Sequence, residues 1–367
     1  MALQGRKRSR LRRVLGAFTA HHLEAQAEDV ALFLAVGAAL SIAASVAVAW
    51  HAGFHEVADH ARHVNPLWFA VALAGAVAAH IGYMLAFREV ARVDDGLPIG
   101  IVRTGAIVAT GFGVFVPRGG FALDVEALTD MGVPVEEARI RVLGLGSLEY
   151  VVLGTAAAAC SILMLLWDFH AQQAVTLSWA IGVPAGTLLA LIALRFRKWL
   201  CRGWFKKVIG PPLEALLVVG KILARPRQHA TAAIFGMSLY FAGEVFVLWA
   251  CLAAFQHGGP SILAVVVGYA TGYALTRRTL PLAGAGAVEA LMPFALAWVD
   301  FKLAAAVLAV FAYRLFNVWL PVPPSLAGLI ALQRRPPTGS VAYAEVGRHD
   351  GDGHALVDAR ARADVHR

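Results

Sequence analysis

The sequence predicts an all-α, polytopic membrane protein with about six full spans and two interrupted, re-entrant helical hairpins. Three observations predict this fold class. Of 367 residues, 59% are hydrophobic and only 15% are charged, whereas a soluble protein carries about 25% charged residues. Six apolar runs are long enough to cross a hydrocarbon core of about 30 Å. Two further apolar regions are interrupted by proline, glycine and arginine.

Each spanning run must supply about 20 mostly apolar residues. The six runs lie near 30–50, 67–87, 142–167, 175–194, 230–254 and 303–330. The last run contains PVPP at 321–324. Because proline lacks a backbone donor and clashes with the preceding turn, we expect this span to kink or to end early.

The chain divides into a basic arm, two membrane halves, a basic connection and a polar tail. The boundaries are 1–29 for the arm, 30–194 for the first half with its interrupted hairpin 97–131, 195–228 for the connection, 229–332 for the second half with its interrupted hairpin 261–299, and 333–367 for the tail. The connection holds nine Lys or Arg and one acidic residue. Aromatic residues among these cations are typical of an amphipathic segment on an anionic membrane surface. The polar composition of the tail predicts disorder.

The distribution of Lys and Arg predicts the orientation in the cell membrane. Positive residues concentrate in cytoplasmic loops, so we expect both termini and 195–228 in the cytoplasm and the histidine-rich loop 51–65 outside. This arrangement requires 97–131 to enter and leave the membrane on one side. A single crossing there would place the nine cations of 195–228 outside. Region 261–299 then enters and returns from the opposite side.

The two interrupted regions resemble each other. Each has a proline, two glycines, a glutamate and a tyrosine in the next span: Pro117, Gly119, Gly120, Glu126 and Tyr150 in the first, and Pro281, Gly284, Gly286, Glu289 and Tyr313 in the second. Proline and glutamate are nine residues apart in one region and eight in the other, and glutamate and tyrosine are 24 apart in both. With opposite orientations this describes an inverted repeat. Interrupted helices in such repeats point to a transporter binding site near mid-membrane.

The residue types at these breaks favour an anionic ligand. Irregular backbone cannot face lipid, so the breaks must line protein or water. A half-helix that begins after glycine presents unpaired N–H groups and the positive end of its dipole, which attract an anion such as a lipid phosphate. The expected substrate-binding residues are Arg118, Gly119, Gly120, Glu126, Arg277, Arg278, Gly284, Gly286 and Glu289.

Charged and polar residues also lie within the predicted spans. Glu149, Glu244 and the Tyr313-Arg314 pair are costly in a membrane interior unless they have partners. We expect Glu149 or Glu244 to pair with Arg314. Such a pair has either a purely structural role or a role in transport, and the sequence leaves both open.

The stretch LPLAGAGAVEALMPFALAWVDFKLAAAVLAVFAYRLFNVWLP, residues 280–321, resembles the C-terminal signature of the lysylphosphatidylglycerol synthase transmembrane-region family, which is also described as flippase-like. A weaker resemblance lies at 116–138, and together they would cover roughly 30–332. The resemblance implies movement of phospholipids, aminoacylated lipids or polyprenyl-linked lipids between leaflets. The sequence has Phe121 where the family often has an acidic residue. It shows no soluble aminoacyl-transferase domain after the membrane region, so lysyl-lipid synthesis is not implied.

These observations favour a flippase-like protein that binds or translocates an anionic lipid, and not an enzyme. An intramembrane enzyme or a scaffold for lipid-linked glycan and cell-envelope synthesis is the alternative. The sequence has no Walker motif and no metal or redox pattern among its three cysteines, so we expect no cofactor, no metal and no catalytic residues. Its positive charges lie beside hydrophobic runs, which favours anionic lipid headgroups over nucleic acid as partners. A second copy of the chain or envelope-synthesis enzymes stay open as protein partners.

Overall fold

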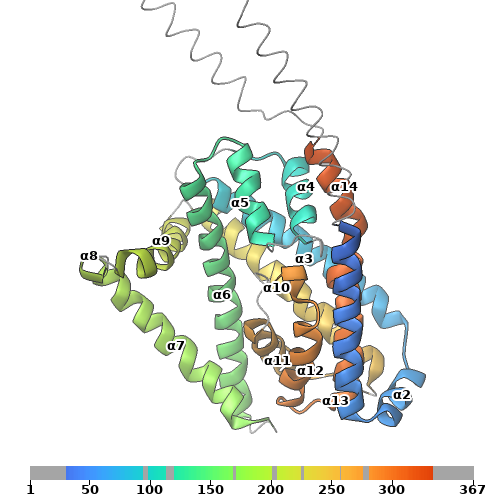
Figure 1. The fold of residues 1–367 in the computed structure, drawn as a ribbon. Coiled ribbons are helices and arrows are strands. Elements are labelled where there is room, and N and C mark those ends of the chain that lie inside the picture. Colours follow the sequence, from blue (N-terminus) through green and yellow to red (C-terminus); the bar gives the residue numbers. More distant parts are fainter. Residues whose placement is uncertain are drawn as a thin grey trace, which may run out of the picture.

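The computed structural model describes residues 30–93, 98–112, 120–167, 171–200, 205–224, 227–256, 258–275 and 281–333. Within these ranges every regular element is helical, which confirms the all-α prediction (Figure 1). Six helices are long and apolar enough to cross a membrane, as predicted. They are Val30–Ala52, α3 (Leu67–Ala91), α6 (Val135–Leu166), α7 (Gln173–Arg195), α10 (Arg227–Phe255) and the combined span Leu303–Gly328.

Two pairs of short helices take the places of the interrupted regions. The first pair is α4 (Ile101–Gly111) with α5 (Gly120–Asp130), and the second is α11 (Ile262–Leu275) with α12 (Ala287–Ala297). An eleven-residue helix is about 16 Å long, which is about half of a hydrocarbon core. In Figure 1 the first pair lies at the upper end of the bundle and the second in its lower half. The two hairpins therefore enter from opposite ends, as an inverted repeat requires.

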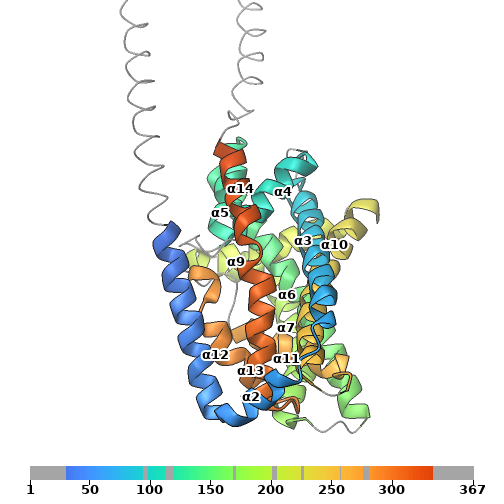
Figure 2. The same cartoon turned by 90° about the vertical axis from the view of Figure 1, so that its right-hand side faces the viewer.

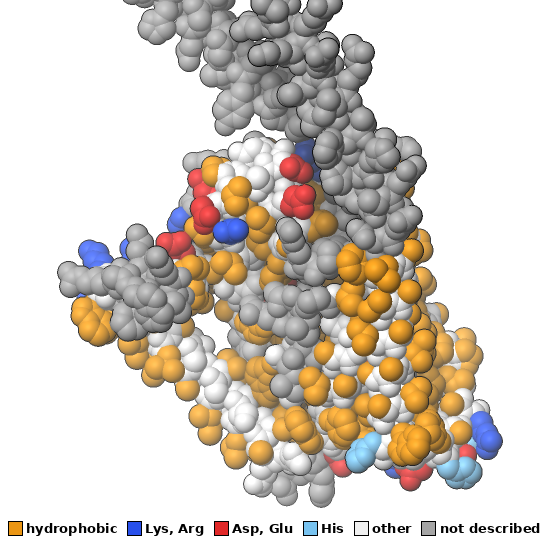
Figure 3. All heavy atoms as spheres, viewed as in Figure 1, with side chains coloured by type: hydrophobic (Ala, Val, Ile, Leu, Met, Phe, Trp, Pro, Cys, Tyr) orange, Lys and Arg blue, Asp and Glu red, His pale blue; other side chains and the backbone are white. Residues whose placement is uncertain are grey.

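Hydrogen bonds between distant segments show which helix ends lie together. At the upper end, Arg141 of α6 donates to the carbonyl of Ala91, the last residue of α3 (3.1 Å). At the lower end, the Asn65 N–H donates to the carbonyl of Ala254 near the end of α10 (2.9 Å). Figure 3 shows apolar side chains over the middle of the visible face and charged ones near both ends. This band is typical of a surface in contact with lipid.

The basic connection differs from its predicted role as a purely interfacial segment. It forms α8 (Arg197–Leu200) and α9 (Phe205–Ala224), and α9 crosses the upper part of α6 (Figure 1). One face of α9 is buried, with Val218 and Ile222 no more than 3% exposed. The segment is therefore amphipathic as predicted, but its apolar face covers α6 as well as facing the membrane.

Helices α3 and α10 form the centre of the bundle and pack along most of their length. Glycines permit this approach: a Cβ on Gly82 would lie 2.4 Å from the backbone nitrogen of Tyr240, and one on Gly243 would lie 2.6 Å from the nitrogen of Ala79. Small residues at helix contacts are the usual means of close packing in membranes, where lipid is as apolar as leucine.

Replacing Gly82 with alanine is therefore expected to destabilise the fold, because the clash is with backbone that cannot move without separating α3 from α10. Overpacking costs typically about 1–3 kcal/mol. Gly186→Ala in α7 is the matched control, since a Cβ there has nothing within 4 Å. Thermal unfolding of the detergent-purified proteins checks this: Gly82→Ala should melt below the unmodified protein and Gly186→Ala should not. Equal melting temperatures would mean that the two helices are not held this closely.

The last span changes its winding where the sequence predicts a kink. Helix α13 (Leu303–Arg314) passes into a π-helical turn, η2 (Leu315–Trp319), and then into α14 (Val322–Gln333). Figure 2 shows these as one long column. The Leu320 N–H donates to the Leu315 carbonyl (2.8 Å), five residues back. The prolines that follow, at 321, 323 and 324, have no N–H to donate to the carbonyl four residues earlier. The wider π-helical turn before them accommodates this interruption of the α-helical hydrogen bonds.

The basic arm 1–29 and residues 334–367 of the polar tail lie outside the described residues. The remaining short helix, α2 (Phe54–Arg62), follows the first span at the lower end of the bundle (Figure 1).

Candidate functional site

The segment just before α12, from Pro281 to Gly286 and called the break below, has an unusual backbone. Leu282 and Ala283 have φ of 54° and 52°, and Gly284 and Gly286 have φ of 68° and 82°. Left-handed backbone costs an L-residue roughly 1–2 kcal/mol, so the two non-glycine residues must be held by their surroundings. Strain of this kind concentrates at binding sites and switches.

The break lies beside the middle of the first span. A Cβ on Gly286 would lie 3.4 Å from both Cβ and the carbonyl oxygen of Leu40. Leu40 is near the middle of the first span, Val30–Ala52. The irregular backbone is therefore about equally far from both ends of that helix.

A buried ion pair holds the break together. Arg314 Nε donates to Glu289 Oε1 (2.8 Å), and the two side chains are 5% and 1% exposed. The same guanidinium donates through Nη2 to the Ala283 carbonyl (2.9 Å). Glu289 Oε2 accepts the N–H of Gly286 (2.9 Å). One carboxylate and one guanidinium thus satisfy backbone groups on both sides of Gly284.

This geometry corrects the predicted partner of Arg314. Arg314 pairs with Glu289, and not with Glu149 or Glu244 as the sequence suggested. The half-helix begins at Ala287, directly after Gly286, and Gly284 lies in the preceding turn (Pro281–Gly284). Glu289 is the third residue of α12 and caps its first turn.

Glu244 has different partners, which come from the last span. It accepts hydrogen bonds from the Tyr313 hydroxyl and from Nδ2 of Asn317. Asn317 lies inside the π-helical turn. The wider turn and the adjacent Arg314 together place donors toward Glu244 and Glu289, which lie on α10 and α12. Nothing in the sequence pattern singled out Asn317.

Two further buried carboxylates accept a tyrosine hydroxyl. Tyr273 of α11 donates to Glu149 Oε2 of α6 (2.8 Å), and this contact joins the two membrane halves. Tyr83 of α3 donates to Asp124 Oδ2 of α5 (3.1 Å). The rings of these tyrosines belong to one aromatic cluster, in which Tyr83 contacts Tyr240 with centroids 5.3 Å apart.

Asp124 takes the buried position that the sequence had assigned to Glu126. Asp124 is fully buried, whereas Glu126 is exposed. The sequence does carry a signal for this, because Leu128, an apolar residue four positions further on, is on the same helical face and is also buried. Gly120 is the first residue of α5. The predicted Arg118, Gly119, Arg277 and Arg278 lie outside the described residues.

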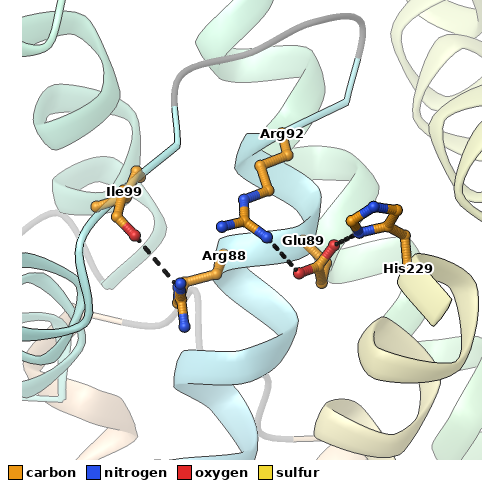
Figure 4. A network of polar contacts seen from close by, with 5 residues as sticks. All are labelled: Arg88, Glu89, Arg92, Ile99 and His229. Atoms are coloured by element: carbon orange, nitrogen blue, oxygen red, sulfur yellow. Dashed lines mark hydrogen bonds and ion pairs between the residues drawn. The ribbon is translucent and has the colours of Figure 1, made fainter.

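A second polar network lies at the upper ends of α3 and α10 (Figure 4). Glu89 is 8% exposed. It accepts from Arg92 Nη1 (3.0 Å), and its other oxygen lies 3.0 Å from Nδ1 of His229. Arg88 Nε donates to the Ile99 carbonyl (3.2 Å), which fixes the chain that enters α4. This network ties the two central helices to the first hairpin.

Among the residues that the structure describes, no three His, Cys, Asp or Glu side chains form a group that could hold a metal ion. A scan against protein-family models finds no match to this chain, and neither does a search of curated proteins. The candidate site is therefore defined by its own geometry: an ion pair, a left-handed break and three carboxylates that accept tyrosine hydroxyls.

Proposed function

We propose that this protein is a lipid transporter that binds the phosphate of an anionic lipid at the break before α12 and moves the headgroup between leaflets. One observation carries the proposal: the Glu289 carboxylate is held by the same donors that would bind the phosphate of a lipid. Its two oxygens accept from the Arg314 guanidinium and from the Gly286 N–H. Both donors are of the kind that binds phosphate.

Release of Glu289 makes these donors available to a ligand. A lipid phosphate that enters between the hairpins competes with the carboxylate for Arg314 and the Gly286 N–H. Departure of the lipid lets Glu289 return, so neither the guanidinium nor the backbone N–H is left without a partner in the membrane interior. Since an unpaired buried charge is costly, this exchange keeps the Arg314 guanidinium paired both with and without lipid, and the displaced Glu289 carboxylate favours release of the phosphate.

The two oppositely inserted hairpins support movement as well as binding. Inverted halves give a transporter two similar conformations, each open to one side. The sequence resemblance of 280–321 to a flippase-like family favours the same function. A scaffold would need neither the strained break nor the ion pair, so loss of Glu289 or Arg314 would leave a scaffold functional if it still folded.

The test is translocation of fluorescent lipids in vesicles containing the purified protein, read from how fast labelled lipid of the inner leaflet becomes accessible to a membrane-impermeant quencher outside. Labelled phosphatidylglycerol should cross faster than in protein-free vesicles and faster than labelled phosphatidylcholine. Equal rates with and without protein for every headgroup would rule out this function.

The proposed orientation puts the upper end of Figure 1 in the cytoplasm of a cell-membrane protein. Arg88 and Arg92, at the end of α3, lie at that end, in agreement with the positive-inside rule. After replacement of the natural cysteines, His55→Cys on α2 should react with an impermeant maleimide in intact cells. Arg139→Cys, near the start of α6, should react only after lysis, and the reverse pattern would invert the orientation.

A further inference from the structure

A pocket of about 430 Å³ lies between α6 and α9 at the upper end of the bundle, away from the break before α12. Its charged lining consists of two acids and two bases: Glu137 and Arg141 from α6, and Glu214 and Lys221 from α9. Apolar residues of α6, α9 and the end of α3 complete it. The volume lies in the range of pockets that hold small ligands.

Each helix brings one acid and one base to this pocket. Glu137 and Arg141 are four residues apart on α6, and Glu214 and Lys221 are seven apart on α9, so each pair lies on one face of its helix. Arg141 is fixed: its side chain is 8% exposed, Nη1 donates to the Ala91 carbonyl (3.1 Å) and Nη2 lies 3.4 Å from Glu137 Oε2. The pocket therefore has a rigid positive wall and, at Glu137 and Glu214, carboxylates that reach solvent.

Helix α9, which lines the pocket, also borders an opening between α6 and α7 (Figure 3). Figure 3 shows an opening between α7 and α6, with charged side chains of both signs near its upper margin, where α9 meets α6. Helix α7 has large exposed apolar side chains, among them Ile181 and Leu188, each about 60% exposed. Acyl chains fit such a surface, while the polar group of the same lipid lies at the level of α9.

We propose that this pocket binds a zwitterionic group that carries both a phosphate and a primary ammonium, the chemistry of a phosphatidylethanolamine headgroup. The phosphate pairs with Arg141 and Lys221, and the ammonium donates to Glu137 and Glu214. A simple anion would meet two carboxylates and a simple cation two bases, so only a ligand with both charges is complementary to the lining. A quaternary ammonium lacks N–H donors and forms no hydrogen bonds with the acids.

This site does not depend on the proposed translocation, because none of its residues contacts Glu289 or Arg314 through any of the hydrogen bonds described above. Binding at α6–α9 and transport through the break before α12 are therefore separable. A variant with slowed transport, such as Gly286→Ala, is expected to bind the zwitterionic lipid with unchanged affinity.

The test is a binding titration of the full chain in detergent, followed by tryptophan fluorescence. The probes are dihexanoyl-phosphatidylethanolamine, dihexanoyl-phosphatidylcholine and soluble phosphoethanolamine. The ethanolamine lipid should bind about tenfold more tightly than the choline lipid, and Glu214→Gln or Lys221→Gln should each weaken it by about tenfold, the effect of losing one charge-assisted hydrogen bond. Glu136→Gln is the control, since that side chain is 81% exposed, lies on α6 next to Glu137 and does not line the pocket.

Each outcome decides the proposal. Binding of the ethanolamine lipid without binding of phosphoethanolamine supports a lipid as the source of the group. Comparable binding of both supports the same site with a soluble metabolite as its ligand. Equal affinity for the ethanolamine and choline lipids would overturn the proposal, and so would full binding by both Glu214→Gln and Lys221→Gln, provided that gel filtration shows folded protein.

Discussion

Arg314→Met is expected to destabilise the protein severely, because it leaves the Glu289 carboxylate buried without its cation. Removing one partner of a buried ion pair typically costs about 3–5 kcal/mol. The Ala283 carbonyl also loses its donor, so the left-handed turn at Leu282–Gly284 loses a contact that holds it. Both effects act on the same few residues, and we expect a large fall in melting temperature and in the yield of folded protein.

The double variant Arg314→Met with Glu289→Gln separates charge from packing. Glutamine still accepts the Gly286 N–H but carries no charge, so the double variant should melt above Arg314→Met alone. Thermal unfolding in detergent, with gel filtration to confirm folded protein, measures the difference. The control is Arg139→Met, which removes the cation from an exposed pair with Glu136 and should change little. If the double variant is as unstable as the sum of the two single variants, Glu289 and Arg314 are not energetically coupled.

Gly286→Ala is expected to slow translocation by about tenfold, equivalent to about 1.4 kcal/mol, in protein that still folds. At φ 82° an L-residue is strained, and its Cβ would press on Leu40 at 3.4 Å. The added methyl group also lies next to the N–H that we assign to the lipid phosphate. The backbone of the site is thus shifted at the point where ligand and Glu289 compete.

A matched control isolates this effect from backbone strain in general. Gly53, in the turn before α2, has φ 92° and nothing within 4 Å of an added Cβ. Gly53→Ala carries comparable strain at the end of the first span, far from the break, and should leave transport at the unmodified rate. Lipid translocation in vesicles with matched amounts of protein compares the two. An equal loss of transport in both variants would mean that Gly286 matters only for stability.

The spans and the hairpins could be predicted from the sequence because each depends on properties that hydropathy and charge report directly. Six apolar runs match six long helices. The excess of Lys and Arg in 195–228 required 97–131 to return to one side, and α4 and α5 are each too short to cross. These predictions needed no knowledge of which helix faces which.

The hydrogen-bond and ion-pair partners of the buried polar side chains could not be predicted, because they depend on which helix faces which. A span that is apolar all round does not show which side faces its neighbours, so the sequence did not reveal that Arg314 turns toward α12 while Tyr313 turns toward α10. The π-helical turn after Arg314 changes the direction of Asn317 as well. Leu282 and Ala283 carry no signal for left-handed backbone, because their conformation is imposed by Arg314 and the surrounding helices.

The most direct measurement of the central claim is the concentration dependence of phosphatidylglycerol translocation by Glu289→Gln compared with the unmodified protein. If the Glu289 carboxylate competes with lipid phosphate for Arg314 and the Gly286 N–H, removing its charge should lower the lipid concentration for half-maximal transport. The maximal rate should fall as well, because the charge that displaces the phosphate is gone. An unchanged half-maximal concentration together with an unchanged maximal rate would contradict the assignment of Glu289 as the internal competitor of the lipid.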